Sequence, residues 1–210
     1  MAFRVGVLIS GRGTNLQALL DRFHHQARRT SDAVVVCVAS SRADAVGLDR
    51  ASEAGVETDV FAQAEYPDRD ARDAALGDWL ERNRVDLVVL AGFMEILGGP
   101  FIRRFEGRLI NVHPSLLPAF PGVRAIEQAL DYGVKVTGVT VHYVDEGVDT
   151  GPVVLQEPFE LPYARGVEEI ERRVHEIEHR LLPRAVELIA AGAVSRDESN
   201  PRLVRIAPER

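Results

Sequence analysis

Four short runs of apolar, mostly β-branched residues lie within the first 112 residues of the 210-residue sequence, and they most constrain its fold. They occupy residues 3–9, 33–39, 86–91 and 109–112, and none alternates strictly between apolar and polar residues. Continuous apolar runs of this length are typical of strands buried on both faces of a sheet.

Helical patterns separate these runs, at residues 15–28, 44–54 and 69–83. In the third, the apolar residues fall largely on one face, which predicts a buried side made of Ala71, Ala74, Ala75, Leu76, Trp79 and Leu80. The alternation predicts an α/β fold: a doubly wound, mostly parallel twisted sheet with helices on both faces and right-handed crossovers.

The second half of the sequence has a different pattern. Residues 113–122 contain three prolines and are expected to be irregular, and residues 125–132 predict a short helix. Longer strands are expected at 136–144 and 152–160, as an at least partly antiparallel pair. Residues 166–191 predict a long helix, bent or restarted at Pro183. The polar tail, 194–210, predicts a hairpin around residues 199–201.

Composition excludes several classes of protein. Cys37 is the only cysteine, so an intrachain disulfide framework and a cysteine-based zinc site are excluded. The net charge of −7 argues against a nucleic-acid-binding surface. No segment reaches the roughly 18 apolar residues of a membrane span, and the N-terminus lacks a signal-peptide pattern. We therefore expect a cytoplasmic protein with no membrane partner.

The glycine-rich segment at residues 10–15, SGRGTN, lies between the first predicted strand and the first predicted helix. Glycines let the backbone approach an anion, and the free amides of a helix start can bind a phosphate. Leu16 stands where the dinucleotide fingerprint has its third glycine, and the lysine of a Walker loop is absent. The segment is interpreted as either a phosphate site or a tight turn with a helix cap.

Asn111 and His113 end the fourth apolar run. Residues two apart on a strand share a face, so both side chains are expected to point the same way, at the sheet edge where ligands bind. An amide beside an imidazole can stabilise an oxyanion while a proton moves. The alternative is a capping Asn and a structural His.

Two further segments carry clustered titratable groups. Residues 145–152 combine three carboxylates with two glycines, and a carboxylate near His113 would raise its pKa; the alternative is a solvated hairpin turn. On the long predicted helix, Glu171, His175 and Glu178 share a face, which is usually a solvated one. His175 and His179 could form a ligand pair, but no second acidic cluster completes a metal site, and we expect none.

Together these segments resemble the phosphoribosylglycinamide formyltransferase family, the folate-dependent transferases of purine biosynthesis. The resemblance covers roughly residues 5–185, in family order. It is carried by VLISGRGTNLQAL at 7–19, SSRADAVGLDRA at 40–51, LVVLAGFMEIL at 87–97, LINVHPSLLPAFPG at 109–122, GVTVHYVDEGVDTGPVVLQ at 138–156, and the helix through His175 and His179.

The resemblance implies an enzyme that moves a formyl group from 10-formyltetrahydrofolate to the amine of glycinamide ribonucleotide. The folate is a co-substrate, and no tightly bound cofactor is expected. Asn111 would donate to the formyl oxygen, His113 would be the catalytic imidazole, and Asp149 would keep it charged. The family also implies one formyltransferase domain over 1–210, with a phosphate-binding α/β half (1–108), a catalytic and folate half (109–192) and a polar tail (193–210). We expect small-molecule partners only, and a monomer or homodimer.

The binding residues implied by the family form two sets. The ribonucleotide set is Gly13, Thr14, Asn15, His175, Glu176 and Glu178. The folate set is Arg69, Leu90, Phe93, Met94, Glu95, Ile96, Leu97, Val144, Asp145, Glu146, Gly147 and Val148.

Three positions depart from the family pattern. Arg124 replaces a frequent histidine and could pair with Asp149 without shuttling a proton; Glu95 stands where some relatives are basic, and Ala119 where some have lysine. An acidic chain argues against a methionyl-tRNA formyltransferase, and a missing glycine argues against a nucleotide-binding oxidoreductase. A formyltetrahydrofolate hydrolase would carry a regulatory domain before the first strand, and a non-catalytic ligand-binding module leaves Asn111, His113 and Asp149 without a role. A related transferase acting on another amine stays open, as does the hydrolase.

Overall fold

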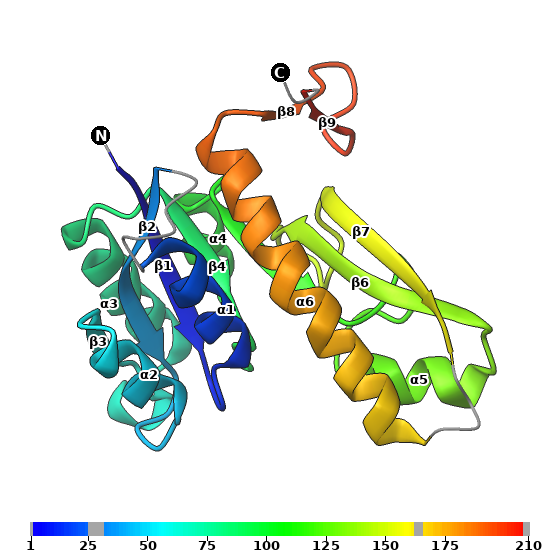
Figure 1. The fold of residues 1–210 in the computed structure, drawn as a ribbon. Coiled ribbons are helices and arrows are strands. Elements are labelled where there is room, and N and C mark those ends of the chain that lie inside the picture. The colour runs from blue at the N-terminus through cyan, green and yellow to red at the C-terminus, as the bar shows by residue number, and fades with distance from the viewer. Residues whose placement is uncertain (1, 25–31, 162–165, 208–210) are drawn as a thin grey trace. The chain divides into compact units, whose positions relative to one another are not determined.

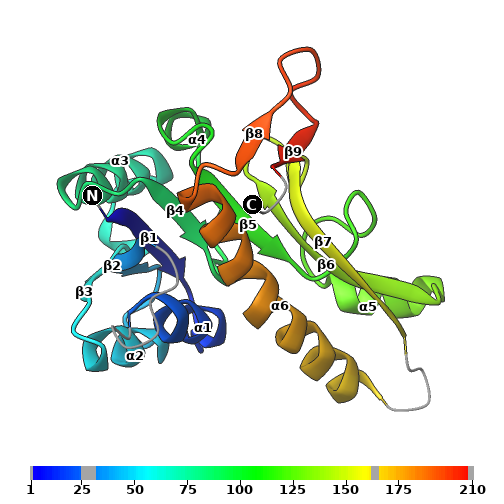
Figure 2. The same ribbon diagram turned by 45° about the horizontal axis from the view of Figure 1, so that its top comes forward.

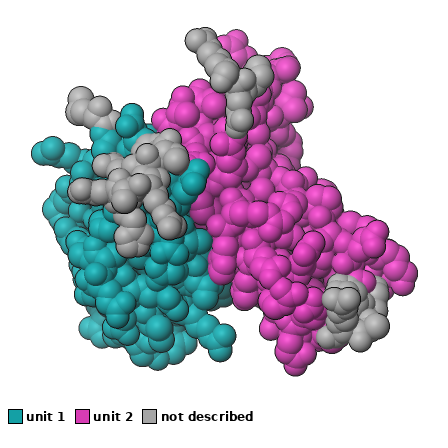
Figure 3. Space-filling model, viewed as in Figure 1, with its two compact units in different colours: residues 1–110 teal, residues 111–210 magenta. Residues whose placement is uncertain are grey.

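The computed structural model describes residues 2–24, 32–161 and 166–207, which form two compact units (Figure 3). Unit 1 is Met1–Ile110 and unit 2 is Asn111–Arg210. The prediction of a single domain with a boundary at 108/109 stays a prediction.

Seven strands form one mixed sheet, in the order β3-β2-β1-β4-β5-β6-β7. In unit 1, β1 (Phe3–Ile9) pairs in parallel with β2 (Ala33–Ser40) and with β4 (Leu87–Leu90), and β2 pairs in parallel with β3 (Glu57–Val60). β5 (Leu109–His113) begins in unit 1 and ends in unit 2. The predicted α/β fold with a mostly parallel sheet is confirmed.

Helices cover both sides of the unit 1 strands (Figure 2). α1 (Thr14–Phe23) and α2 (Gly47–Glu53) lie on one side, and α3 (Arg69–Arg82) and α4 (Gly99–Arg104) lie on the other. The apolar strand residues between them are fully buried; Val7, Leu8 and Val88 have no exposed surface. Asp68 caps α3 by accepting a hydrogen bond from the Ala71 amide at 2.8 Å. A short 3₁₀ turn, η2 (Gln63–Glu65), precedes α3.

In unit 2, α5 (Ala125–Tyr132) matches its predicted bounds. β6 (Val136–Tyr143) and β7 (Val153–Glu160) pair antiparallel, as expected. The long helix α6 (Val167–Ala190) packs on both strands through a buried stripe that includes Val174, Ile177 and Leu182 (Figure 1). It runs on through Pro183, so the alternative of a restart there is wrong.

The tail forms the predicted hairpin from β8 (Val194–Arg196) and β9 (Val204–Ile206). α1 was expected to extend to residue 28; it is described to Phe23, and residues 25–28 lie outside the described part of the chain. Within the described ranges, no helix is long and apolar enough to cross a membrane.

Candidate functional site

In unit 1, two loops leave the carboxyl ends of adjacent strands. One follows β1 (residues 10–13) and the other follows β4 (residues 91–98). The chain passes from β1 to β2 on one side, whereas β4 lies on the other side of β1. Such a reversal of strand order is where open α/β sheets bind ligands.

Ser10 fastens these two loops together. Its amide donates to the Gly92 carbonyl at 3.1 Å, and its hydroxyl oxygen accepts from the Met94 amide at 2.8 Å. The same hydroxyl lies 2.6 Å from the Ser41 hydroxyl, at the end of β2. Because Ser10 and Ser41 are both buried, these bonds fix where each loop begins.

The loop after β1 turns into α1 at Gly13, whose φ of 69° lies in the left-handed region. A β-carbon at Gly13 would lie 2.6 Å from the Cα of Gly47 on α2, so only glycine fits here. Thr14 and Asn15 form the first turn of α1, which carries no acidic residue and whose first amides have no partner within the helix. The geometry suits an anion, and a β-carbon at Gly11 would meet open space.

The loop after β4 holds most of the folate set predicted in unit 1. Met94 and Ile96 are 73% and 72% exposed, whereas Leu90 at the end of β4 and Leu97 in the loop are buried. Arg69 is half-exposed at the start of α3, with Nε 3.9 Å from Asp70 Oδ1. The structure therefore groups two apolar side chains on a surface loop, and their role in binding folate stays a prediction.

A buried ion pair, Arg72 and Asp73, underlies this loop. Arg72 is 1% exposed, and its Nη2 lies 2.7 Å from Asp73 Oδ1. The apolar face predicted for α3 is therefore wrong in part: Ala74 is exposed, while Arg72 and Asp73 are buried beside Leu76. Binary patterning places charged residues outside and could not have found this pair.

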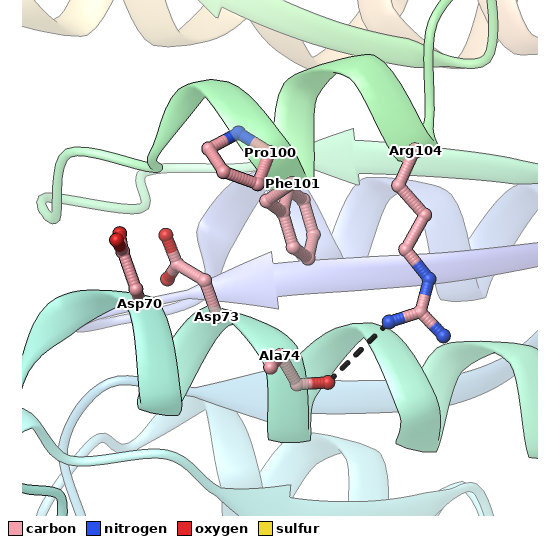
Figure 4. Close-up of a pocket in the computed structure, with 6 residues that line it drawn as sticks. All are labelled: Asp70, Asp73, Ala74, Pro100, Phe101 and Arg104. Carbon is pink, nitrogen blue, oxygen red and sulfur yellow. Dashed lines mark hydrogen bonds between the residues drawn. The ribbon is translucent and has the colours of Figure 1, made fainter.

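A small pocket of about 120 Å³ lies between α3 and α4 of unit 1 (Figure 4). Asp70 and Asp73 border it from α3, Pro100 and Phe101 from α4, and Arg104 donates to the Ala74 carbonyl at 3.5 Å beside it. None of the predicted site residues lines it.

In unit 2, the predicted catalytic residues meet in one cluster. His113 Nδ1 lies 3.3 Å from Asp149 Oδ2, and Asn111 donates from Nδ2 to Asp149 Oδ1 at 3.4 Å. His113 Nε2 donates to the Phe120 carbonyl at 2.8 Å. Both ring nitrogens of His113 thus face groups that only accept, and a doubly protonated ring satisfies both contacts.

Asp149 is held in place by its backbone as well as by its side chain. Its φ of 52° is left-handed, and its Oδ2 accepts from the Gly122 amide at 2.7 Å. Burial by itself raises the pKa of Asp149, but hydrogen bonds from His142 and from the Gly122 amide, with the charges of His113 and His142, hold it below its usual value. The carboxylate therefore stays ionised beside His113.

His142 on β6 completes the cluster and was not predicted. Its Nδ1 donates to the Tyr143 carbonyl at 2.9 Å, and its Nε2 lies 3.3 Å from Asn111 Nδ2 and 3.5 Å from Asp149 Oδ1. The alternating pattern of residues 137–143 places His142 on the same face as Thr140, but the sequence alone does not tell which strand that face meets.

The other predicted unit 2 residues differ in their surroundings. Asp145 accepts from the Gly147 amide at 3.1 Å and from the Thr150 hydroxyl at 2.5 Å, so it orders its own turn rather than reaching a histidine. Val148 is 63% exposed. Val144 is partly buried, and Glu146 is exposed. Arg124 pairs with Glu127 at 3.3 Å, rather than with Asp149, the partner that the sequence left possible.

On α6, His175 Nδ1 lies 3.1 Å from the buried Glu178 carboxylate. Glu176, also predicted, is exposed and pairs with Arg172. The rings of His175 and His179 stack at 6.1 Å, and burial together with the charge of His175 lowers the pKa of His179. Among the residues that the structure describes, no cluster of three or more His, Cys, Asp or Glu could hold a metal ion.

Comparisons with known proteins confirm the resemblance. The formyl transferase family model matches residues 3–186. The chain is 40% identical over 189 residues to phosphoribosylglycinamide formyltransferase of Haemophilus influenzae, covering 90% of this chain and 88% of that protein. It is 48% identical to the trifunctional purine biosynthetic protein adenosine-3 of Bos taurus, covering 93% of this chain but only 19% of that protein. The crystal structure of glycinamide ribonucleotide transformylase 1 from Symbiobacterium toebii superposes with a TM-score of 0.92, at 47% identity, over 99% of this chain and 95% of that one.

Proposed function

Because the chain belongs to the formyl transferase family, we propose that it transfers the formyl group of 10-formyltetrahydrofolate to the amine of glycinamide ribonucleotide. The products are formylglycinamide ribonucleotide and tetrahydrofolate, in de novo purine biosynthesis. Folate is a co-substrate that leaves after each turnover. The observation that carries the proposal is the meeting of Asn111, His113 and Asp149 in one partly buried cluster.

Each member of this cluster has a chemical role. The neutral amine nitrogen attacks the formyl carbon, and the carbonyl electron pair moves to the oxygen. The Asn111 amide and the charged His113 ring stabilise that oxyanion. When the pair returns, the bond to the folate nitrogen breaks; the attacking amine nitrogen loses one proton and the folate nitrogen gains one, with His113 passing the proton between them. Asp149 keeps the ring charged and oriented.

To act on the substrate, His113 must exchange one of its hydrogen bonds. Its Nε2 donates to the Phe120 carbonyl, so the substrate oxygen has to replace that carbonyl as acceptor. Phe120 lies in the proline-rich segment and has a φ of 52°, a conformation that costs free energy for a residue other than glycine.

The binding roles follow the predicted sets. Gly13, Thr14 and Asn15 hold the ribonucleotide phosphate through backbone and side-chain donors, and Glu178 with His175 and Glu176 contacts its ribose or amine. Met94–Leu97 with Phe93 and Leu90, residues 144–148 and Arg69 contact the folate. The left-handed Gly13 and the exposed Met94 and Ile96 support these roles. The cytoplasmic location and the choice between monomer and homodimer stay predictions.

A direct assay tests the proposal. Purified protein is mixed with 10-formyltetrahydrofolate and glycinamide ribonucleotide, and the formylated ribonucleotide is measured by mass spectrometry. We expect product formation in equal amount to tetrahydrofolate. Tetrahydrofolate and free formate in equal amounts without acceptor would identify the hydrolase instead, and transfer only to another amine would identify a related transferase.

A further inference from the structure

The most deeply buried charges of unit 1 belong to α3. Arg72 is 1% exposed and Asp73 is 4% exposed, although they are neighbours in the sequence. Arg72 donates to Asp73 Oδ1 through Nε at 3.0 Å and through Nη2 at 2.7 Å. A guanidinium and a carboxylate buried together need further hydrogen-bond partners, and these partners show what the pair does.

All the remaining partners of the pair lie in the loop after β4. Arg72 Nη1 donates to Glu95 Oε2 at 3.2 Å, and Nη2 donates to the Ile96 carbonyl at 3.0 Å. Asp73 Oδ2 accepts from the Gly98 amide at 2.6 Å. The pair therefore forms hydrogen bonds with one side chain, one backbone carbonyl and one backbone amide, all within residues 95–98 of that loop.

The loop is fastened at its other end by Ser10, through the Gly92 carbonyl and the Met94 amide. Met94 and Ile96, whose backbone groups take part in these two sets of bonds, are exposed to solvent. Exposed apolar side chains on a loop held at both ends form a preorganised contact surface, because the loop loses little conformational entropy when a ligand binds.

We propose that Arg72, together with Asp73, is a positioning residue that holds the 92–98 loop in the conformation that binds the folate co-substrate. The inference rests on the proposed function, which assigns this loop to folate. Arg72 touches no reacting atom and acts only through Glu95, Ile96 and, by way of Asp73, Gly98. Within the predicted folate set, Glu95 thereby also helps to hold the loop, through the ion pair of its carboxylate with Arg72.

The test uses three variants of the whole chain. Arg72→Lys keeps the charge but loses the fork that reaches several partners at once. Arg72→Met with Asp73→Asn removes both charges together, so that no buried charge is left without its partner. Glu95→Gln weakens a single, half-exposed contact. The control is Arg104→Gln, which removes an arginine whose side-chain hydrogen bonds go to Ala74, Asp78 and Glu81 of α3.

Two measurements are made on each variant. Amide hydrogen exchange of residues 92–98 reports the loop, and calorimetry with tetrahydrofolate reports binding without any transfer step. Where transfer occurs, KM is measured for each substrate. We expect both the Lys variant and the double variant to speed loop exchange and to weaken tetrahydrofolate binding about tenfold, with a matching rise in the folate KM. The ribonucleotide KM and kcat should change by less than about twofold. Glu95→Gln should have a folate KM between those of the parent protein and the Arg72 variants. The control, Arg104→Gln, should match the parent protein.

The outcomes separate this inference from the proposed function. Faster loop exchange with unchanged tetrahydrofolate binding would overturn the inference, as would an equal rise in both KM values or no change in exchange. A parent protein that fails to bind tetrahydrofolate would overturn it as well. A parent protein that binds tetrahydrofolate but formylates no ribonucleotide would overturn the proposed function alone, since the binding and exchange data still test the positioning role.

Discussion

Each unit of the molecule holds an aspartate paired with a basic side chain, and the two aspartates have partners of different chemistry. Asp73 in unit 1 pairs with an arginine, which keeps its proton at any physiological pH. Asp149 in unit 2 pairs with His113 and lies near His142, and an imidazole is the side chain best suited to exchanging protons in catalysis. A permanent charge pair suits the holding of a loop, whereas an exchangeable one suits the movement of a proton.

The largest expected effect comes from changing the residues around Asp149 in unit 2. His113→Ala or Asn111→Ala takes away one oxyanion donor, which typically costs about 10²–10³ in kcat. The fold should survive, because Asp149 keeps the Gly122 amide as a partner. The measurements are steady-state transfer and circular dichroism. Turnover within about threefold of the parent in either variant would contradict the role.

A matched pair of substitutions sharpens the comparison. Asp149→Asn and Asp73→Asn each replace a carboxylate by an amide of the same shape. We expect the first to lower kcat by about 10²-fold or more, because the ring of His113 loses its counter-charge. The second should leave kcat within about threefold and should weaken folate binding instead. Equal losses of kcat would contradict the assignment of Asp149 to catalysis and of Asp73 to holding the loop.

Arg72→Met by itself tests stability. It leaves the Asp73 carboxylate buried without its main partner, for which the expected cost is about 3–5 kcal/mol in the free energy of unfolding. Adding Asp73→Asn should recover part of this loss. Urea unfolding measures both variants. A single variant as stable as the parent would mean that water reaches Asp73 or that the pair contributes nothing net.

A smaller effect concerns acid. Because the pKa of Asp149 is lowered on folding, its ionised form stabilises the folded state at any pH above the ordinary aspartate value of about 3.9. This contribution is lost as the pH falls through the lowered folded value. The stability advantage of the parent over Asp149→Asn should therefore be constant near neutrality and should shrink below about pH 4. An advantage that grew on acidification would contradict the direction of the shift.

The smallest effect comes from His179. Its folded pKa lies below the ordinary value of about 6.5, so the unfolded chain takes up the proton first as the pH falls. Folding stability is thus lost from about pH 6.5 downward, through the folded value. His179→Gln should lose less stability than the parent between about pH 7.5 and about pH 5.5 in thermal unfolding. Identical pH dependence would refute the assignment.

The sequence predicts the buried strands and the amphipathic helices well, since burial on two faces leaves a continuous apolar run. β1 and α5 have the bounds expected. β3 was not expected because its sequence, ETDV, belongs to an edge strand that is partly exposed. α4 was not expected because it has only six residues and begins with Gly99 and Pro100.

The candidate site divides along similar lines. Asn111 and His113 were paired from strand geometry, because residues two apart share a face. His142 and the Arg72–Asp73 pair were not found, because a buried polar residue is recognised by its partners and these lie on other elements. The sequence did not indicate that Arg124 would turn toward Glu127, since that choice depends on its left-handed backbone at the start of α5.

The contact between Gly13 and Gly47 has a consequence for mutational data. A methyl group on Gly47 would strike Ile9 at 2.5 Å and Gly13 at 3.2 Å, so a change in α2 would shift the turn into α1. Gly47→Ala should then look like a loss of ribonucleotide affinity although the residue has no predicted contact with the ligand. A mutational scan restricted to residues near the substrate would miss this effect of Gly47. In a library that varies Gly13 and Gly47 together, few variants should keep activity.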